Sequence, residues 1–311
     1  MECARPAPIL IWLRGMRAPF FSASIVPVLV GGAAALYASG RFQWGFFLVT
    51  LVGMVALHAA ANMSNDYFDH KSGCDPHNPA RTIFNGGSNV IADGLLSERA
   101  MLIGIALAYA IGIACGLFLA LAMGPQGWVV LVLGLVGVAI SLAYTAPRVL
   151  LAGRGLGEAG IALCFGLLAV QGTAYVQTGA FTWPGLLASL PVTGLIVAIL
   201  WINQFPDIAA DHAVGKDNLV VRLGPARARW GYYALLALAY LPVIGGAAGG
   251  VLPPWALLAL GGLPLALRAA SILHRHYAES AALLPAQAAT IQAHLVTGLL
   301  LALGLLLGSL L

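Results

Sequence analysis

The feature that most constrains this chain is a series of long apolar runs, each close to the length that crosses a lipid bilayer as a helix. Such a helix needs roughly 20 predominantly apolar residues. Only 8% of the 311 residues are charged, whereas a soluble domain carries about 25%. The sequence therefore predicts an all-α, multi-pass membrane protein with a single transmembrane domain over residues 1–311. Its nine expected spans cover about 18–39, 45–65, 100–122, 127–146, 157–177, 184–205, 230–249, 252–272 and 289–310.

The connections between these runs alternate between a short, nearly uncharged kind and a longer, charged kind. Of the fifteen Lys and Arg residues, only Arg41 falls in a connection of the first kind. Because cytoplasmic loops carry an excess of Lys and Arg, we expect the N-terminus and the longer connections to face the cytoplasm. Nine spans then place the C-terminus outside. All eleven acids map to the cytoplasmic side, so we expect a cell (inner) membrane protein whose site opens to the cytoplasm.

Two short acidic stretches interrupt the oily sequence. Asp66 and Asp69 are three residues apart, and Asp207 and Asp211 are four apart, so each pair shares one helical face. With Asp75, these stretches hold five of the eleven acids. Acids in or near hydrocarbon are costly and mark functional sites. We therefore expect two loops that bind Mg²⁺, because this ion takes one or two carboxylates together with waters and phosphate oxygens.

Two facing carboxylate pairs would hold Mg²⁺ ions that bridge a diphosphate. Asn65 offers an amide oxygen to the same site, and Asp75 would reach it from the connection. Carboxylates alone repel a diphosphate, so cations are needed beside them; Arg can bond two phosphate oxygens at once, and Lys acts as a point charge. The nearby candidates are Lys71, Arg81, Arg148, Arg154, Lys216 and Arg222.

Mg²⁺ and these cations would stabilise a departing pyrophosphate. The allylic carbocation that remains would be sheltered by an apolar cavity with aromatic walls. The candidate aromatic residues are Tyr67, Phe68, Tyr144 and Tyr175. His58 lies within the second span, and we interpret it as a hydrogen-bonded packing residue rather than a ligand.

The two acidic stretches also indicate a weak internal repeat. Asp66 and Asp207 follow the second and the sixth expected spans, 141 positions apart (207 − 66). Each is followed by a second acid, a glycine and a basic segment. The pattern predicts two four-helix units and one additional ninth helix.

These residues resemble the UbiA-type family of intramembrane prenyltransferases, whose two motifs have the forms NDxxDxxxD and DxxxDxxxG. Asn65-Asp66-x-x-Asp69 matches the first, and Asp207-x3-Asp211-x3-Gly215 matches the second. The third acid of the first motif is displaced to Asp75. This arrangement resembles the menaquinone branch, the 1,4-dihydroxy-2-naphthoate polyprenyltransferases. Three further segments, 85–97, 144–158 and 216–224, resemble the same branch.

The chain departs from the branch pattern around its second motif. Pro206 stands where branch members often have Arg just before the motif. Asp217 and Asn218 replace the usual Arg and Thr that follow Lys216. The loss of two cations near the diphosphate bears on the choice of substrates and leaves the family resemblance intact.

The resemblance implies nine helices around a central cavity, capped by the motif segments, with Mg²⁺ and the diphosphate under the cap. It assigns metal binding to Asp66, Asp69, Asp75, Asp207 and Asp211. It assigns diphosphate binding to Asn65, Lys216, Arg222 and Arg148, and we add Lys71 and Arg81 by their position. With Tyr144, the four motif acids Asp66, Asp69, Asp207 and Asp211 are the expected catalytic residues.

The expected function is Mg²⁺-dependent transfer of a polyprenyl group from prenyl diphosphate to an aromatic acceptor. The resemblance favours 1,4-dihydroxy-2-naphthoate, giving demethylmenaquinone and CO₂. The acceptor alternatives are 4-hydroxybenzoate, homogentisate and a glycerol-phosphate lipid precursor. A membrane transporter is the alternative class, but the acids fall at the ends of the spans rather than at the midplane. We expect the lipid bilayer as surroundings and no nucleic-acid partner; prenyl chain length and oligomeric state stay open.

Overall fold

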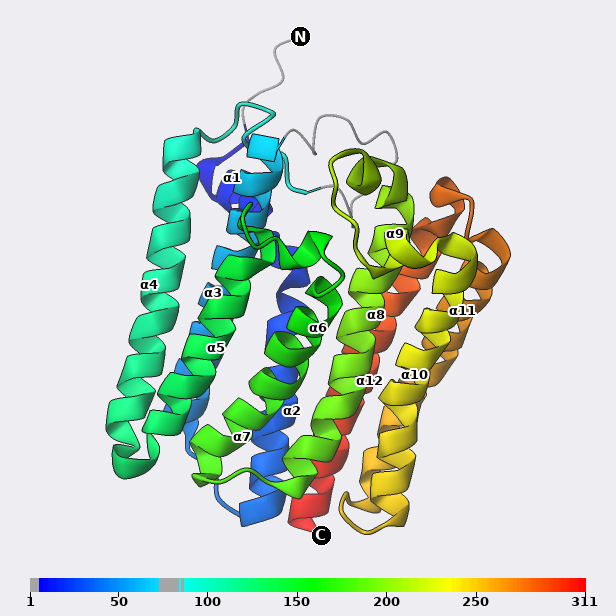
Figure 1. Cartoon of the computed structure of the whole chain (residues 1–311). Coiled ribbons are helices and arrows are strands. Elements are labelled where there is room, and N and C mark those ends of the chain that lie inside the picture. The colour runs from blue at the N-terminus through cyan, green and yellow to red at the C-terminus, as the bar shows by residue number, and fades with distance from the viewer. Residues whose placement is uncertain (1–5, 73–83, 85–86) are drawn as a thin grey trace.

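The computed structural model describes residues 6–72, 84 and 87–311, and every regular element within them is a helix (Figure 1). The first half contains α1 (Pro8–Gly15), η1 (Ala18–Phe21), α2 (Ser22–Ser39), α3 (Trp44–Ser72), α4 (Glu98–Ala122), η3 (Gly124–Gln126), α5 (Trp128–Thr145), η4 (Leu151–Gly153), α6 (Gly157–Ile161), η5 (Ala162–Leu168) and α7 (Ala169–Thr178). The second half contains α8 (Trp183–Ala213), α9 (Leu219–Leu223), α10 (Pro225–Ala248), η6 (Pro254–Gly262), α11 (Leu263–His276), η7 (Ser280–Leu283) and α12 (Leu284–Leu310).

Nine helical stretches of the described chain are long and apolar enough to cross a membrane, which confirms the predicted number and order of spans. Two of them continue beyond their predicted ends at 65 and 205. α3 runs to Ser72 and α8 to Ala213. Hydrophobicity marks only the part of a helix that lies in lipid, whereas helical hydrogen bonding continues into the polar region. The four motif acids therefore lie on helix ends rather than in loops.

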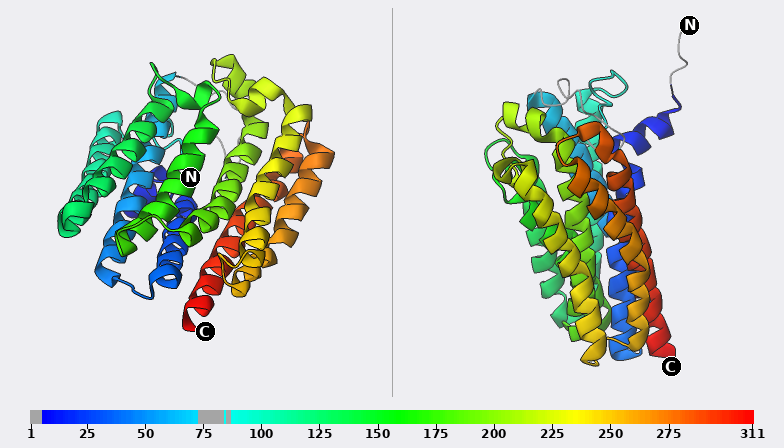
Figure 2. Two further views of the ribbon diagram at one scale, coloured as in Figure 1. Left: turned by 60° about the horizontal axis from the view of Figure 1, so that its bottom comes forward. Right: turned by 90° about the vertical axis from the view of Figure 1, so that its right-hand side faces the viewer.

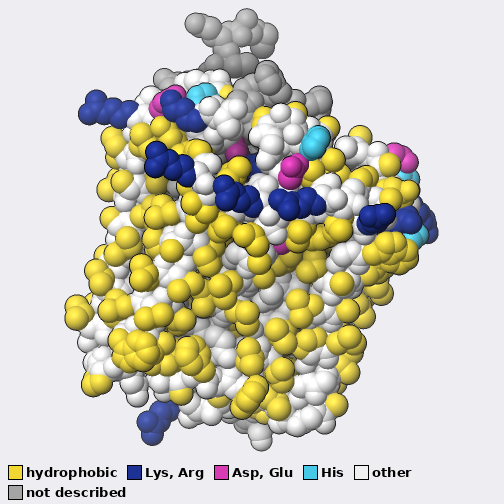
Figure 3. Space-filling view, viewed as in Figure 1, with side chains coloured by type: hydrophobic (Ala, Val, Ile, Leu, Met, Phe, Trp, Pro, Cys, Tyr) yellow, Lys and Arg dark blue, Asp and Glu magenta, His cyan; other side chains and the backbone are white. Residues whose placement is uncertain are grey.

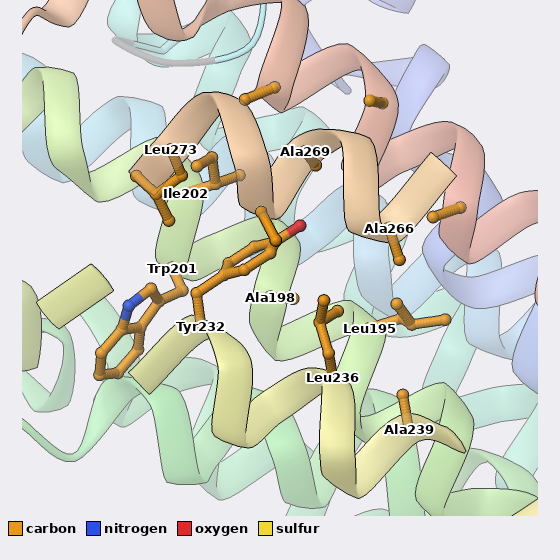
Figure 4. Packing of buried hydrophobic residues seen from close by; sticks show 14 of the residues in the cluster. Leu195, Ala198, Trp201, Ile202, Tyr232, Leu236, Ala239, Ala266, Ala269 and Leu273 are labelled. Carbon is orange, nitrogen blue, oxygen red and sulfur yellow. The ribbon is translucent and has the colours of Figure 1, made fainter. Parts of the chain in front are cut away.

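One side of the molecule is a tightly packed group of helices around α8. In the most apolar part of α8, 72% of the residues are buried. Figure 4 shows Tyr232 of α10 among Ala198, Ile202 and the α11 residues Ala269 and Leu273, in one apolar cluster. At its edge, the indole of Trp201 donates a hydrogen bond to the Ala228 carbonyl at 2.9 Å. This packing fixes the axis of α8 and with it the position of the second acid pair.

The opposite side, formed by α4 and α5, is much more open. In the most apolar parts of these two spans, 17% and 11% of the residues are buried. The two helices lie on the left side of the bundle in Figure 1 and in the left-hand view of Figure 2. Many of their large apolar side chains are exposed, including Leu107, Leu121 and Leu142, as expected of helices that face lipid.

Charge is confined mainly to one end of the bundle. In Figure 3, the Lys and Arg side chains of the visible face lie mostly near the end that carries α1 and α9. The described N-terminal residues lie at this end and the C-terminus at the other (Figures 1 and 2). The predicted segregation of charge is therefore present in the fold. The predicted repeat of two four-helix units stays a prediction.

The fifth span is irregular at its centre. α6 leads into η5, whose seven residues are π-helical, and α7 completes the span. Within η5, Gly166 packs directly on Thr193 of α8, because a Cβ at this glycine would meet the threonine Oγ1 at 1.9 Å. π-helical segments inside α-helices are frequent at functional sites. Here the segment lies beside the cavity described below.

Candidate active site

The two acid pairs are brought together at the charged end of the bundle. The ammonium of Lys216, which follows the second pair, bonds both carboxylate oxygens of Asp69 at 3.0 and 3.3 Å. Both side chains are largely buried, with 16% and 15% of their surface exposed. The bond joins positions 147 residues apart. It therefore places the end of α3 beside the α8–α9 connection, as the two-motif prediction requires.

Asp66 is the more deeply buried of the two acids in the first pair. It forms an ion pair with the guanidinium of Arg17. Its two carboxylate oxygens also accept hydrogen bonds from the Ser88 backbone N–H, at 3.3 and 3.1 Å. Arg17 adopts left-handed backbone angles just before η1, with φ of 51°. Such a conformation is strained for a residue other than glycine, so the ion pair helps to hold a strained backbone.

Asn65 is bonded to one acid of the first pair. Its amide nitrogen donates to the Asp69 carboxylate at 2.7 Å, four positions and one helical turn away. Asn65 also lines the cavity beneath the pair. Asn65 therefore lies between Asp69 and the cavity, and its part in a diphosphate site stays a prediction.

The second pair has a different environment. Asp211 is buried, and its carboxylate accepts a hydrogen bond from the Asn218 amide at 2.9 Å. The Asn218 amide oxygen in turn accepts from the Val221 N–H at 3.0 Å and so caps α9. Gly215 supplies the positive φ of 72° that turns the chain between α8 and α9. Asp207 lies one helical turn before Asp211 and is half-buried.

The other predicted cations lie nearer the surface. Lys71 pairs with Glu98 at 2.7 Å and is about half exposed. Arg222 is exposed and donates to the Asp217 carbonyl at 2.7 Å. Arg148 is exposed, and its backbone carbonyl accepts from Arg154 at 3.0 Å. The structure thus brings Lys216 into the core of the site and leaves these three side chains around it.

Two predicted site residues, Asp75 and Arg81, lie outside the described residues. Among the residues that are described, no three His, Cys, Asp or Glu side chains converge as a metal site. The carboxylates of the two pairs fit Mg²⁺, which commonly takes one or two carboxylates and completes its shell with water and substrate phosphate oxygens.

Sequence reasoning missed several residues that build the site. The sequence prediction gives no role to Arg17 or Ser88, and both contact Asp66. It gives none to Glu158, whose buried carboxylate accepts hydrogen bonds from the Gln204 amide at 2.9 Å and the Leu219 N–H at 3.1 Å. Glu158 thereby ties α6 to α8 and α9. A lone glutamate at the start of an apolar span was the available signal.

A cavity of about 550 Å³ extends into the apolar part of the bundle from Arg17 and Asn65, which bond the two acids of the first pair. On α3, its lining runs from Asn65 back to Val49, which corresponds to roughly 24 Å at about 1.5 Å per residue. The remaining wall comes mainly from α4, α5, η5 and α7 and is mostly apolar. The cavity is polar beside Arg17, Asn65 and Tyr144 and is mostly apolar further along α3.

The aromatic lining differs from the prediction. Tyr144 lines the cavity, as does Phe165 of η5. The other three predicted aromatic residues do not appear in its wall. Tyr67 and Phe68 pack on each other with ring centroids 5.5 Å apart, and Tyr175 bonds the Gln126 carbonyl at 3.1 Å, at the uncharged end. Composition alone could not indicate which side of each helix faces the cavity.

Comparison with known proteins gives concordant results. Residues 24–291 match the model of the UbiA prenyltransferase family. The chain is 33% identical to a 1,4-dihydroxy-2-naphthoate octaprenyltransferase of Mycobacterium tuberculosis, covering 83% of this chain and 84% of that protein. It is 30% identical to a 2-carboxy-1,4-naphthoquinone phytyltransferase of Synechocystis, covering 96% and 94%. A solved UbiA homologue from Archaeoglobus fulgidus, bound to GPP and Mg²⁺, superposes with a TM-score of 0.56 at 16% identity, covering 94% and 99%.

Proposed function

Because the chain belongs to the UbiA prenyltransferase family, and is thus a multi-pass membrane polyprenyltransferase, we propose that its acceptor is 1,4-dihydroxy-2-naphthoate. Its immediate product is the hydroquinone form of demethylmenaquinone, since the transfer itself oxidises nothing. Transfer to a naphthoate acceptor is the activity named for the M. tuberculosis relative. The donor is a polyprenyl diphosphate. Prenylation replaces the acceptor's carboxyl group, which leaves as CO₂.

One observation carries the proposal: Arg17 and Asn65 line the polar end of a long apolar cavity and bond the acids of the first pair, and Lys216 bonds Asp69 beside them. A prenyl diphosphate is likewise polar at one end and apolar along the rest, with a highly charged head and a hydrocarbon tail. The head fits the acids and cations once Mg²⁺ is bound, and the tail fits the apolar wall. A transporter would need charged or polar groups further along the path, and the lining beyond His58 is mostly apolar.

We propose Mg²⁺ as the metal, held by Asp66 and Asp69 on α3 and by Asp207 and Asp211 on α8. Asp75 joins the first pair in this proposal. When bound, the ions neutralise the charge that develops on the leaving pyrophosphate. The A. fulgidus homologue with GPP and Mg²⁺ supports this choice of metal.

The protein's own groups have three proposed tasks. Lys216 contacts the diphosphate, and the surrounding Lys71, Arg81, Arg148 and Arg222 add positive charge to the mouth of the site. Asn65 and Tyr144, at the polar end of the cavity, orient the diphosphate and the reacting carbon. The apolar wall excludes water from the carbocation, so that the electron-rich ring of the acceptor captures it instead of a hydroxide or water molecule.

We propose that the protein lies in the inner membrane of a bacterial cell and that its site faces the cytoplasm. The support is the segregation of Lys and Arg to the end that carries the site. A C-terminal alkaline phosphatase fusion should then be active, and a C-terminal green fluorescent protein fusion dark. The reverse result would invert the proposed orientation.

The function is tested by a transfer assay with purified protein in detergent. The assay contains Mg²⁺, geranylgeranyl diphosphate and 1,4-dihydroxy-2-naphthoate, with 4-hydroxybenzoate and homogentisate in parallel and EDTA as a control. Product with the naphthoate alone, lost in EDTA, is the expected outcome. Product with another acceptor would overturn the naphthoate proposal, and activity in EDTA would overturn the Mg²⁺ proposal.

A further inference from the structure

His58 is a polar side chain in an otherwise apolar part of the cavity wall. It lies on α3, two helical turns before Asn65, which is a rise of roughly 10 Å, and it lines the cavity. The side chain is 7% exposed. The structure agrees with the sequence interpretation that it is hydrogen bonded, because its Nδ1 and the Ser24 Oγ of α2 are 2.7 Å apart. The imidazole is therefore anchored from one edge.

The ring is also held by two aromatic neighbours. Phe21 of η1 meets it edge-on with centroids 5.6 Å apart, and Phe165 of η5 does so at 4.7 Å. Three separate elements thus fix one imidazole. A residue needed only to fill space does not require such orientation, whereas a recognition group gains from it, since little rotamer entropy is then lost on binding.

The second ring nitrogen, Nε2, has no hydrogen bond to any of the described residues. A polar atom in an apolar surrounding is costly unless it finds a partner. The partner must come from the contents of the cavity. A prenyl tail is hydrocarbon and offers neither donor nor acceptor, so it cannot be that partner.

We propose that His58 binds a ring hydroxyl of the aromatic acceptor through Nε2 and so orients the ring beneath the prenyl diphosphate. The inference rests on the proposed function and adds a residue that recognises the acceptor. A hydroxyl suits this position because it can donate or accept, whichever ring nitrogen carries the proton. The acceptor's carboxylate is better placed at the cationic mouth, where Arg17 and Lys216 lie. The bond formed is non-covalent, and His58 is a binding and positioning residue in this proposal.

Ser24 has an indirect part in the same recognition. Its hydroxyl shares the Nδ1 hydrogen bond and so sets both the ring orientation and the tautomer. Loss of this hydroxyl should loosen the imidazole without removing it. Thr50 provides a matched control, because it lines the same cavity on the same helix while its hydroxyl is already bonded to the Phe46 carbonyl at 2.7 Å.

The first measurement is steady-state transfer by the full-length wild type and His58→Leu, with acceptor and donor varied separately. Loss of one hydrogen bond corresponds to a change of about tenfold. We expect the acceptor KM to rise about tenfold in His58→Leu while the KM of the prenyl diphosphate stays within about twofold. Ser24→Ala should show a smaller rise in acceptor KM, and His58→Gln should retain most of the acceptor affinity. Thr50→Val should leave the acceptor KM at its wild-type value, because the Thr50 hydroxyl is bonded to the Phe46 carbonyl.

The second measurement needs no turnover of the probe. 4-Hydroxy-2-naphthoate and 2-naphthoate, which differ by one hydroxyl, are compared as inhibitors of the wild type, His58→Gln and His58→Leu. The wild type should bind the hydroxylated compound about tenfold more tightly, His58→Gln should keep a preference, and His58→Leu should have none. A hydroxyl preference that survives in His58→Leu would overturn the inference while leaving the proposed function standing. No transfer by the wild type to any aromatic acceptor would overturn the proposed function, and this inference with it.

Discussion

The two acid pairs are similar in sequence but are stabilised in different ways. On α3, Asp66 is paired with Arg17 and Asp69 with Lys216, so both negative charges are matched by cations from distant parts of the chain. On α8, Asp211 is comparably buried, yet its side-chain partner is the neutral amide of Asn218. Asp211 makes no ion pair with any of the described residues.

This difference indicates that the first pair supports the fold as well as the proposed chemistry. Removing one member of a buried ion pair leaves an uncompensated charge, which is strongly destabilising. A buried carboxylate without an ion pair instead favours the arrival of a cation from solution. The α3 pair should therefore be sensitive in both stability and activity, and Asp211 in activity alone.

The largest expected effect is that of Asp66→Ala. Transfer should fall by at least about 10³-fold, as for the loss of a group that stabilises developing charge. The melting temperature in detergent should also fall by several degrees, because the ion pair with Arg17 is lost and the Ser88 N–H loses its acceptor. Size-exclusion chromatography after heating measures the melting temperature. Near-normal turnover would remove Asp66 from the proposed metal site.

Asp211→Asn should separate activity from stability. We expect transfer to fall by about 10²- to 10³-fold, while the melting temperature stays equal to or above that of the wild type, since a buried charge is removed. The same thermal assay run beside Asp66→Ala makes the comparison direct. If both variants lose several degrees, the contrast between the two pairs is wrong.

Lys216→Met tests the bond that joins the pairs. A hydrogen bond to a charged group contributes about 1.5–3 kcal/mol, so the KM of the prenyl diphosphate should rise about 10- to 100-fold. The acceptor KM should change less. Arg275→Ala removes an exposed cation at the end of α11, on the same charged face, and serves as the control. Equal effects of the two substitutions would indicate a general charge effect rather than a specific contact.

Asn218→Ala should have the smallest effect of the set. It removes the hydrogen bond to Asp211 and the cap of the five-residue helix α9. An N-cap contributes about 1 kcal/mol, and we expect transfer to fall by about three- to tenfold. Asn218→Ser retains a capping oxygen, so it should restore α9 and leave only the Asp211 bond missing. An Asn218→Ala enzyme with full activity would show that Asp211 needs no positioning from this side.

The helical part of the fold was accessible from the sequence because its signals are local. Runs of about 20 apolar residues predict spans by their length alone, and the nine candidate spans of the described chain agree with them. The ends of α3 and α8 were predicted too early, because Ser72 and Ala213 lie beyond the apolar part. This error does not affect the predicted arrangement of the acids. Asp66 and Asp69 share one helical face, and so do Asp207 and Asp211, because both pairs lie on the longer helices.

The sequence by itself determined the family, the helical membrane architecture and the segments that carry the acids. Only the tertiary structure decided which cation meets which acid, which aromatic residues line the cavity, and that His58 faces it. The reason is that these contacts join residues far apart in the chain, such as Asp69 and Lys216, 147 positions apart. These contacts depend on how each helix is rotated about its axis and how far it is shifted along it. Packing around α8 and the π-helical segment η5 fixes both quantities, and no local sequence pattern predicts them.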